Sequence, residues 1–184
     1  MGTRAGRLAL PALRGAAQLV SKAMRIACGF DHAGVPLRDA VVAALEGDGH
    51  TVLDAGTYDD YPYAAAAVAR ALGDAAERAV LVCGSGAGVS VAATKLPGVR
   101  AATVHDGYTA HQGVEHDDLN VLCLGARVIG PQLAGEIVCA FAAARFSGEA
   151  RHLRRLRQVA ALERDGVAAL PPEELRSQDT GDHR

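Results

Sequence analysis

This chain of 184 residues has few cysteines, no long apolar run and no excess of one charge, and each of these absences argues against a class of protein. Four cysteines are too few for the disulfide framework of a small secreted protein. No apolar run approaches the roughly 20 residues that cross a bilayer, so we expect no membrane contact. Neither sign of charge dominates, because 19 basic and 21 acidic residues give a net charge of −2, which argues against a nucleic-acid partner. With 49% hydrophobic residues the chain can still bury a core, and these properties together predict a cytoplasmic protein.

Acidic residues are absent from the first 25 positions, which hold five basic ones, so this segment carries +5 and the remainder −7. Arg7 and Arg14 interrupt its apolar stretch, which argues against a secretory signal. An organelle transit peptide and a translation start upstream of a true beginning at Met24 both stay open. We expect residues 1–23 to be a disordered extension, 24–164 to be one α/β domain and 165–184 to be a loose tail.

From Met24 onward, short apolar runs alternate with helical patterns. Strands are expected over 25–30, 51–54, 79–83, 101–104 and 121–124, and helices over 36–46, 64–77, 89–95, 108–115, 131–146 and 151–164. A polar loop is expected over 58–63. Continuous apolar strands alternating with helices predict an open, doubly wound parallel sheet with the flavodoxin-like order 2-1-3-4-5. In that order the ends of strands 1 and 3 flank the ligand site, which places Asp31 and His32 beside Cys83.

A glycine-rich segment, Gly84-Ser85-Gly86-Ala87-Gly88, follows the third strand. Bare backbone N–H groups in such a loop can approach an anion at the start of the next helix. The alternative is an ordinary tight turn. Cys83, just before the loop, is either a base or nucleophile whose thiolate is stabilised there or a small buried hydrophobic residue. We assign the buried role to the other three cysteines, Cys28, Cys123 and Cys139.

Histidines supply the other candidates for proton transfer. His116 lies in a polar segment before the fifth strand, where it either shuttles protons or is solvated. His32 has the same two interpretations, and Asp31 beside it either contacts a ligand or caps a helix. His105, His111 and His116 lack the spacing of metal ligands, so we predict no metal and no cofactor.

The last predicted helix is strongly basic, with Arg151, Arg154, Arg155 and Arg157. Arginine suits bidentate phosphate binding, although these side chains also fit a solvated face of an amphipathic helix. A small domain cannot bury both faces of such a terminal helix, so we expect it to reach a second subunit.

Five motifs, in order, resemble those of the sugar-phosphate isomerase family of ribose-5-phosphate isomerase B and the galactose-6-phosphate isomerase subunits. They are Gly29–Gly34, Asp60–Pro62, Cys83–Ser90, His116–Val121 and Arg151–His152. The resemblance extends from Met24 to about Glu163.

This resemblance implies a metal-free aldose–ketose isomerisation of ribose 5-phosphate through a cis-enediolate, in a homodimer or tetramer whose site is shared between subunits. It implies that Cys83 is the base, Ser85 its hydrogen-bonding assistant and His116 the ring-opening group. The implied sugar contacts are Asp31, His32, Tyr61, Gly84, Gly86, Gly88 and Asp117. The implied phosphate ligands are Arg127, Arg151 and Arg155. Val89 stands where some relatives have a catalytic glutamate, so the chain is similar to the cysteine type.

Two positions depart from the usual family pattern. This chain has Asp117 and Thr94 where the family usually has asparagine. A carboxylate at Asp117 would repel a phosphorylated substrate placed near it. The same chemistry on a tetrose or hexose phosphate therefore stays open, as does a non-catalytic phosphate- or nucleotide-binding module. A redox-sensing protein is disfavoured because Cys83 has no resolving cysteine near it in the sequence.

Overall fold

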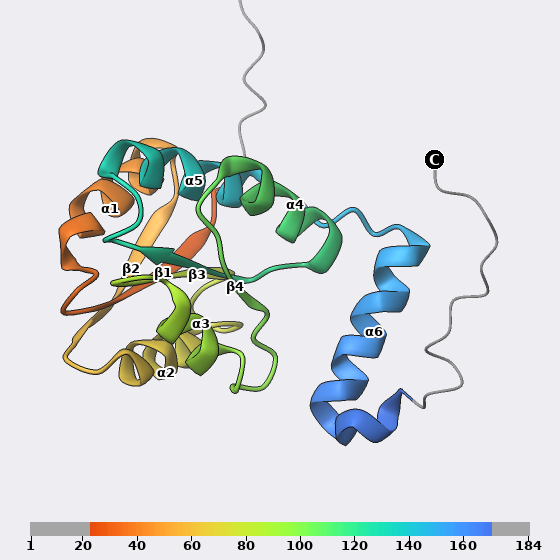
Figure 1. Ribbon diagram of the computed structural model, residues 1–184. Helices are drawn as coiled ribbons and strands as arrows, with labels where there is room; N and C mark the ends of the chain where they lie inside the picture. The colour runs from red at the N-terminus through yellow and green to blue at the C-terminus, as the bar shows by residue number, and fades with distance from the viewer. Residues whose placement is uncertain (1–22, 171–184) are drawn as a thin grey trace, which may run out of the picture.

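The computed structural model describes residues 23–170, in which strands and helices alternate (Figure 1). The strands are β1 (Arg25–Asp31), β2 (Thr51–Tyr58), β3 (Arg78–Cys83), β4 (Ala101–Thr103) and β5 (Val121–Gly125). The helices are α1 (Arg38–Gly47), α2 (Tyr61–Ala71), α3 (Ala87–Ala93), α4 (Gly107–Asp117), α5 (Pro131–Ala143) and α6 (Ala150–Asp165), with short 3-10 turns η1 (Val35–Leu37) and η2 (Gly166–Ala169). The predicted extension 1–23 and tail 165–184 fall mostly outside the described residues.

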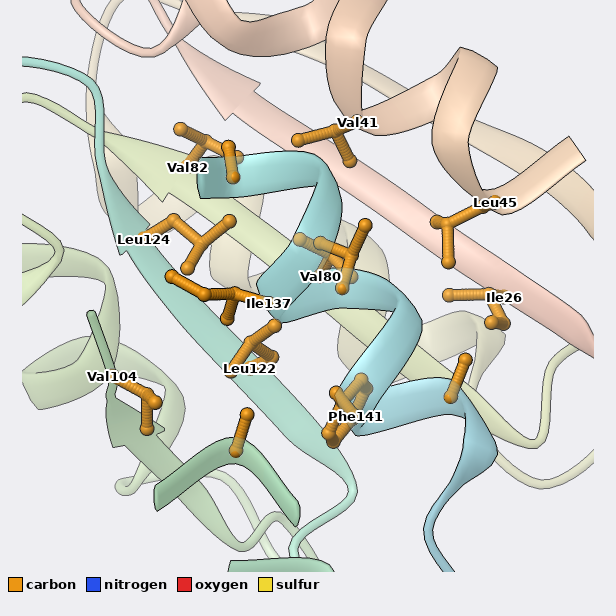
Figure 2. Close-up of a cluster of buried hydrophobic side chains, with 14 of the residues drawn as sticks. Ile26, Val41, Leu45, Val80, Val82, Val104, Leu122, Leu124, Ile137 and Phe141 are labelled. Atoms are coloured by element: carbon orange, nitrogen blue, oxygen red, sulfur yellow. The ribbon is translucent and has the colours of Figure 1, made fainter. Parts of the chain in front are cut away.

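Side chains along the central strands alternate between two core clusters, one on each face of the sheet. Helices lie on both faces (Figure 1). Helices α1, α4 and α5 cover one face, where large residues fill the core (Figure 2): Ile26, Val41, Leu45, Val80, Val82, Leu122, Leu124, Ile137 and Phe141. Helices α2 and α3 cover the other face, where the buried residues are mostly small: Ala27, Ala64, Ala65, Ala79, Cys83, Ala93 and Cys123. The predicted doubly wound parallel sheet is confirmed.

The order of the strands is β2-β1-β3-β5-β4, so the predicted 2-1-3-4-5 is wrong for the last two. Every residue of β5 is buried, and the strand is paired on both sides by β3 and β4. In contrast, β4 has only three residues, none of them fully buried. A strand buried on both faces gains most from a central place, and a short, partly exposed strand suits the edge.

Several element boundaries also differ from the sequence-based ones. Helix α2 begins at Tyr61, inside the expected polar loop, and ends at Ala71, six residues early. It ends there because Leu72 is extended and Gly73 has a positive φ of 92°. Helix α4 continues to Asp117, so His116 lies in a helix rather than in a loop. That helix stops where Asp118 adopts a left-handed conformation with φ 48°.

Helix α6 lies beside the domain, next to α4 and beyond β4 (Figure 1). It is attached near both ends: His152 is buried near its start, and Glu163 accepts the N–H of Gly98 at 2.7 Å near its end. Its apolar side chains Leu153, Val159 and Leu162 are 37–49% exposed, so residues 23–170 of the same chain do not cover this stripe. Among these residues no helix is both long and apolar enough to span a membrane.

Candidate active site

The turns that follow β1 and β3 form one cleft of about 380 Å³ at the carboxyl edge of the sheet. The predicted meeting of Asp31 and His32 with Cys83 is therefore confirmed. The cleft is lined by Asp31, His32, Ala33, Tyr61, Cys83, Gly84, Ser85, Gly88, Arg127 and Val128. Ala33 and Val128 were missed by the sequence analysis, because small apolar residues in loops carry no chemical signal.

The turn after β1 lies directly on β3. A Cβ at Gly34 would be only 2.1 Å from the carbonyl oxygen of Val82, so glycine permits this close approach. The buried carboxylate of Asp31 fixes the turn by accepting the N–H groups of Ala33 at 2.9 Å and Gly34 at 2.8 Å. Asp31 therefore lines the cleft and closes the turn, but it does not cap a helix, because the N-cap of η1 is Gly34 and no side chain caps it.

Cys83 lines this cleft and is 4% exposed. Its Sγ accepts the N–H of Gly86 at 3.1 Å, an interaction that stabilises negative charge on sulfur. The environment of two other cysteines is different: burial raises the pKa of Cys28 and of Cys123 to about 12. These two thiols stay protonated and serve as small core residues, as the sequence suggested.

The glycine-rich loop is held in one conformation by its neighbours. Gly86 has a φ of 82°, which favours glycine, and its carbonyl oxygen accepts the hydroxyl of Thr103 at 3.0 Å. Ser85 Oγ accepts the N–H of Ala87 at 3.3 Å. A Cβ at Gly88 would be 3.2 Å from the Tyr61 ring, so the missing side chain allows this ring to lie on the loop.

Two further side chains frame the cleft. His32 Nδ1 lies 2.9 Å from the carbonyl oxygen of Asp59. Because a carbonyl only accepts, Nδ1 carries the proton, and a neutral ring then has its acceptor on Nε2. Arg127 passes over Gly84, whose absent Cβ would be 3.6 Å from its guanidinium carbon, and it brings a positive charge into the cleft.

Four predicted site residues lie elsewhere in the same chain. His116 is in the last turn of α4, at the amino edge of the sheet, whereas Cys83 pairs with Gly125 at the carboxyl edge. Strand β5 alone separates these edges by roughly 13 Å. Asp117 follows His116 and is exposed, and α6 carries the exposed Arg151 and Arg155. One chain therefore does not bring these residues to the cleft.

His116 is stacked on a second histidine, His152 of α6. The ring centroids are 4.2 Å apart and the rings are inclined by 28°. Ser147 Oγ lies 2.6 Å from Nδ1 of His152, and the N–H of Ser147 is donated to the carbonyl of Glu115 at 2.9 Å. Burial, reinforced by the adjacent His116 and Arg151, lowers the pKa of His152. The stack fixes the N-terminal end of α6 on α4.

The chain is similar to known proteins over most of its length. Residues 26–159 match the family described as "Ribose/Galactose Isomerase". The chain is 40% identical over 144 residues to ribose-5-phosphate isomerase B of Escherichia coli K12, covering 76% of this chain and 96% of that enzyme. D-erythrulose-4-phosphate isomerase of Pectobacterium atrosepticum is 39% identical over 132 residues, covering 68% and 86%. The structure of Trypanosoma brucei type B ribose 5-phosphate isomerase has a TM-score of 0.72 at 40% identity, covering 76% and 98%.

The buried His152 gives the protein a stability that depends on pH. Because its pKa is lowered from the ordinary 6.5, the unfolded chain takes up a proton that the folded chain resists. Folding stability that is present above pH 6.5 is therefore lost as the pH falls below it. We expect the unfolding temperature to drop between about pH 7.5 and about pH 5.5, and to drop less in His152→Phe, which keeps a stacked ring but cannot be protonated.

Thermal unfolding of both proteins at the two pH values tests this expectation. An equal drop in the two proteins would show that other groups set the acid sensitivity.

Proposed function

We propose that this chain, which belongs to the ribose/galactose isomerase family, interconverts D-ribose 5-phosphate and D-ribulose 5-phosphate. Family membership makes it a sugar-phosphate isomerase and removes the alternative of a non-catalytic binding module. The observation that carries the proposal is the Cys83 thiol, which accepts a backbone N–H and lines the same cleft as Arg127. A relative named ribose-5-phosphate isomerase B at 40% identity supports the choice of a pentose.

Cys83 is the proposed base. Its thiolate takes the proton from C2 of the open-chain aldose, and the C2–H electron pair forms the C1–C2 double bond while the C1 carbonyl oxygen becomes an oxyanion. After a proton passes from O2 to O1, the thiol returns its proton to C1 and C2 becomes the carbonyl. Ser85 assists by hydrogen bonding, and the amides of the Gly84–Gly88 loop stabilise the oxyanion.

The other cleft residues bind and orient the substrate. Asp31, His32 and Tyr61 contact the sugar, together with the backbone of Gly84 and Gly88. Gly86, a further predicted contact, is buried in the same loop and does not line the cleft. Arg127 binds the phosphate, because a guanidinium matches two phosphate oxygens at once. The Arg127 guanidinium lies in the same cleft as the proposed base. The phosphate and the reacting carbons are therefore bound at the same edge of the sheet.

A second copy of the chain completes the proposed site. The group proposed to open the furanose ring, His116, does not line this cleft and lies at the opposite edge of its own sheet. Arg151 and Arg155, the further phosphate ligands, project from α6, whose apolar stripe is uncovered in the single chain. Packing of that stripe on a partner would bury Leu153, Val159 and Leu162. We therefore propose a homodimer in which His116, Asp117, Arg151 and Arg155 serve the partner's cleft.

A tetrose phosphate is the alternative substrate, because the Pectobacterium relative is a D-erythrulose-4-phosphate isomerase. Asp117 and Thr94 are the positions at which the sugar preference can differ.

Steady-state kinetics with four-, five- and six-carbon aldose phosphates test the substrate. We expect kcat/KM for ribose 5-phosphate to exceed that for erythrose 4-phosphate and for a hexose 6-phosphate by about tenfold or more, since a misplaced phosphate forfeits at least one charged contact. A higher kcat/KM for the tetrose phosphate would reassign the substrate and leave the isomerase chemistry intact.

Cys83→Ala should lower kcat by a factor of about 1,000 or more while the affinity for the sugar phosphate changes little, because it removes the base and keeps the cleft. Isomerisation followed by NMR gives kcat, and calorimetric titration gives the affinity. Cys139→Ala is the matched control, since that thiol is partly buried against α1 and accessible only outside the cleft. Full turnover by Cys83→Ala would exclude this residue as the base.

Mixing two inactive variants tests the shared site. When Cys83→Ala and His116→Ala chains are unfolded together and refolded, half of the dimers contain one of each. One of the two clefts in such a dimer has both an intact thiol and an intact histidine. About a quarter of the wild-type activity should therefore reappear.

The control mixes Cys83→Ala with Ser85→Ala, whose lost groups belong to the same cleft. That pair should recover little activity, because every cleft with Cys83 lacks Ser85. Failure of the first pair to recover activity would place His116 and Cys83 in one chain's site.

A further inference from the structure

His105 follows β4 and lies against the end of β5. Its Nε2 is 3.0 Å from the backbone nitrogen of Gly125, which donates the hydrogen bond. Because an N–H only donates, Nε2 is the unprotonated nitrogen of this ring. The spacing of His105 already argued against a metal ligand, and its imidazole is engaged here by a backbone N–H.

Gly125 is the point at which β5 supports the proposed catalytic loop. A Cβ on this residue would lie 2.6–2.8 Å from backbone atoms of Ser85, so the two backbones touch. Gly125 also pairs with Cys83 across the sheet, and the next residue, Ala126, donates its N–H to the Cys83 carbonyl at 2.8 Å. The position of Gly125 therefore sets the positions of Cys83 and Ser85.

The His105 imidazole accepts a hydrogen bond that the backbone of a neighbouring strand would otherwise accept. Regular pairing of β4 with β5 ends at Thr103 and Cys123, and Val104 donates the last backbone bond to Cys123 at 3.0 Å. Beyond that point the N–H of Gly125 is satisfied by a side chain. Thr103, two residues earlier, donates its hydroxyl to the carbonyl of Gly86. Thr103, at the end of β4, therefore holds the glycine-rich loop, and His105, just after β4, holds the end of β5.

We propose that His105 is a positioning residue for the isomerisation, which it serves by fixing Gly125 and, through that residue, Cys83 and Ser85. The inference rests on the proposed function, since it assigns His105 a role toward the proposed base and oxyanion loop. Removing the acceptor leaves a half-buried N–H without a partner, and the strand end then shifts to find one. Reacting groups displaced by about 1 Å lose up to roughly 100-fold in rate.

Three substitutions at His105 separate the hydrogen bond from the bulk of the ring. The amide oxygen of His105→Gln can reach the place of Nε2, whereas that of His105→Asn reaches only the place of Nδ1, and His105→Leu has no acceptor. We expect His105→Gln to keep kcat within about threefold. His105→Asn and His105→Leu should lose about 10- to 100-fold in kcat with KM changed by less than about twofold.

Inhibitor binding distinguishes positioning from general destabilisation. A phosphorylated pentitol resembles the substrate, and a phosphorylated aldonohydroxamate resembles the enediolate. His105→Asn should bind the pentitol phosphate normally and the hydroxamate about 10- to 100-fold more weakly, in proportion to its loss of kcat. A purely structural role would lower the fraction of folded protein and leave both affinities of the folded molecules unchanged.

Amide hydrogen exchange gives a readout that needs no activity. Exchange at Gly125 and at residues 84–88 should accelerate in His105→Asn and His105→Leu and stay near the wild-type rate in His105→Gln. Equal kinetics and equal exchange in the Gln and Asn variants would overturn the proposal. If the wild-type protein isomerised no sugar phosphate, the proposed function would fail, while the exchange rates would still decide whether His105 holds Gly125.

Discussion

The parallel direction of all five strands is the constraint on which the rest of this structure depends. It collects the carboxyl ends of β1, β3 and β5 at one edge, where Asp31, Cys83 and Gly125 lie together. It also sends each connecting helix back to the opposite edge, so a residue at the end of α4 is carried away from the cleft. A proposed base and ring-opening histidine on these two elements cannot meet within one chain. The topology of the sheet is thus the basis of the proposed cooperation between two chains.

The contrast between the two core faces explains how the cleft is built. Large side chains such as Phe141 and Leu122 fill the space beneath α1, α4 and α5. On the other face alanines allow α2 and α3 to lie close to the sheet, and Cys83 points to this side. The close packing brings the Tyr61 ring at the start of α2 against Gly88 at the start of α3. The small residues thus serve the site as well as the core.

Much of this arrangement was accessible from the sequence, for identifiable reasons. Apolar runs broken by glycine predicted the strands. The rule that ligands bind at the carboxyl ends of parallel strands predicted that Asp31 and His32 lie near Cys83. The order of β4 and β5 was missed because it depends on competition between two strands for a central place, although the stronger apolar run of β5 was a usable signal. The helical setting of His116 was missed because Asp118, not glycine or proline, ends α4. The contact between His105 and Gly125 carries no sequence signal, since it joins a loop to a strand 20 residues away.

The cysteines show how the same side chain acquires different chemistry in this fold. Cys28 and Cys123 lie in the middle of central strands, where burial raises their pKa to about 12 and no backbone donor reaches their sulfur among the described hydrogen bonds. Cys83 is the last residue of its strand, where the chain turns and the N–H of Gly86 is directed back at Sγ. A residue further back would lose that donor, because strand N–H groups are engaged by neighbouring strands. The end of a parallel strand is thus the place where a thiol is both sheltered by the core and supplied with a hydrogen bond that stabilises its anion.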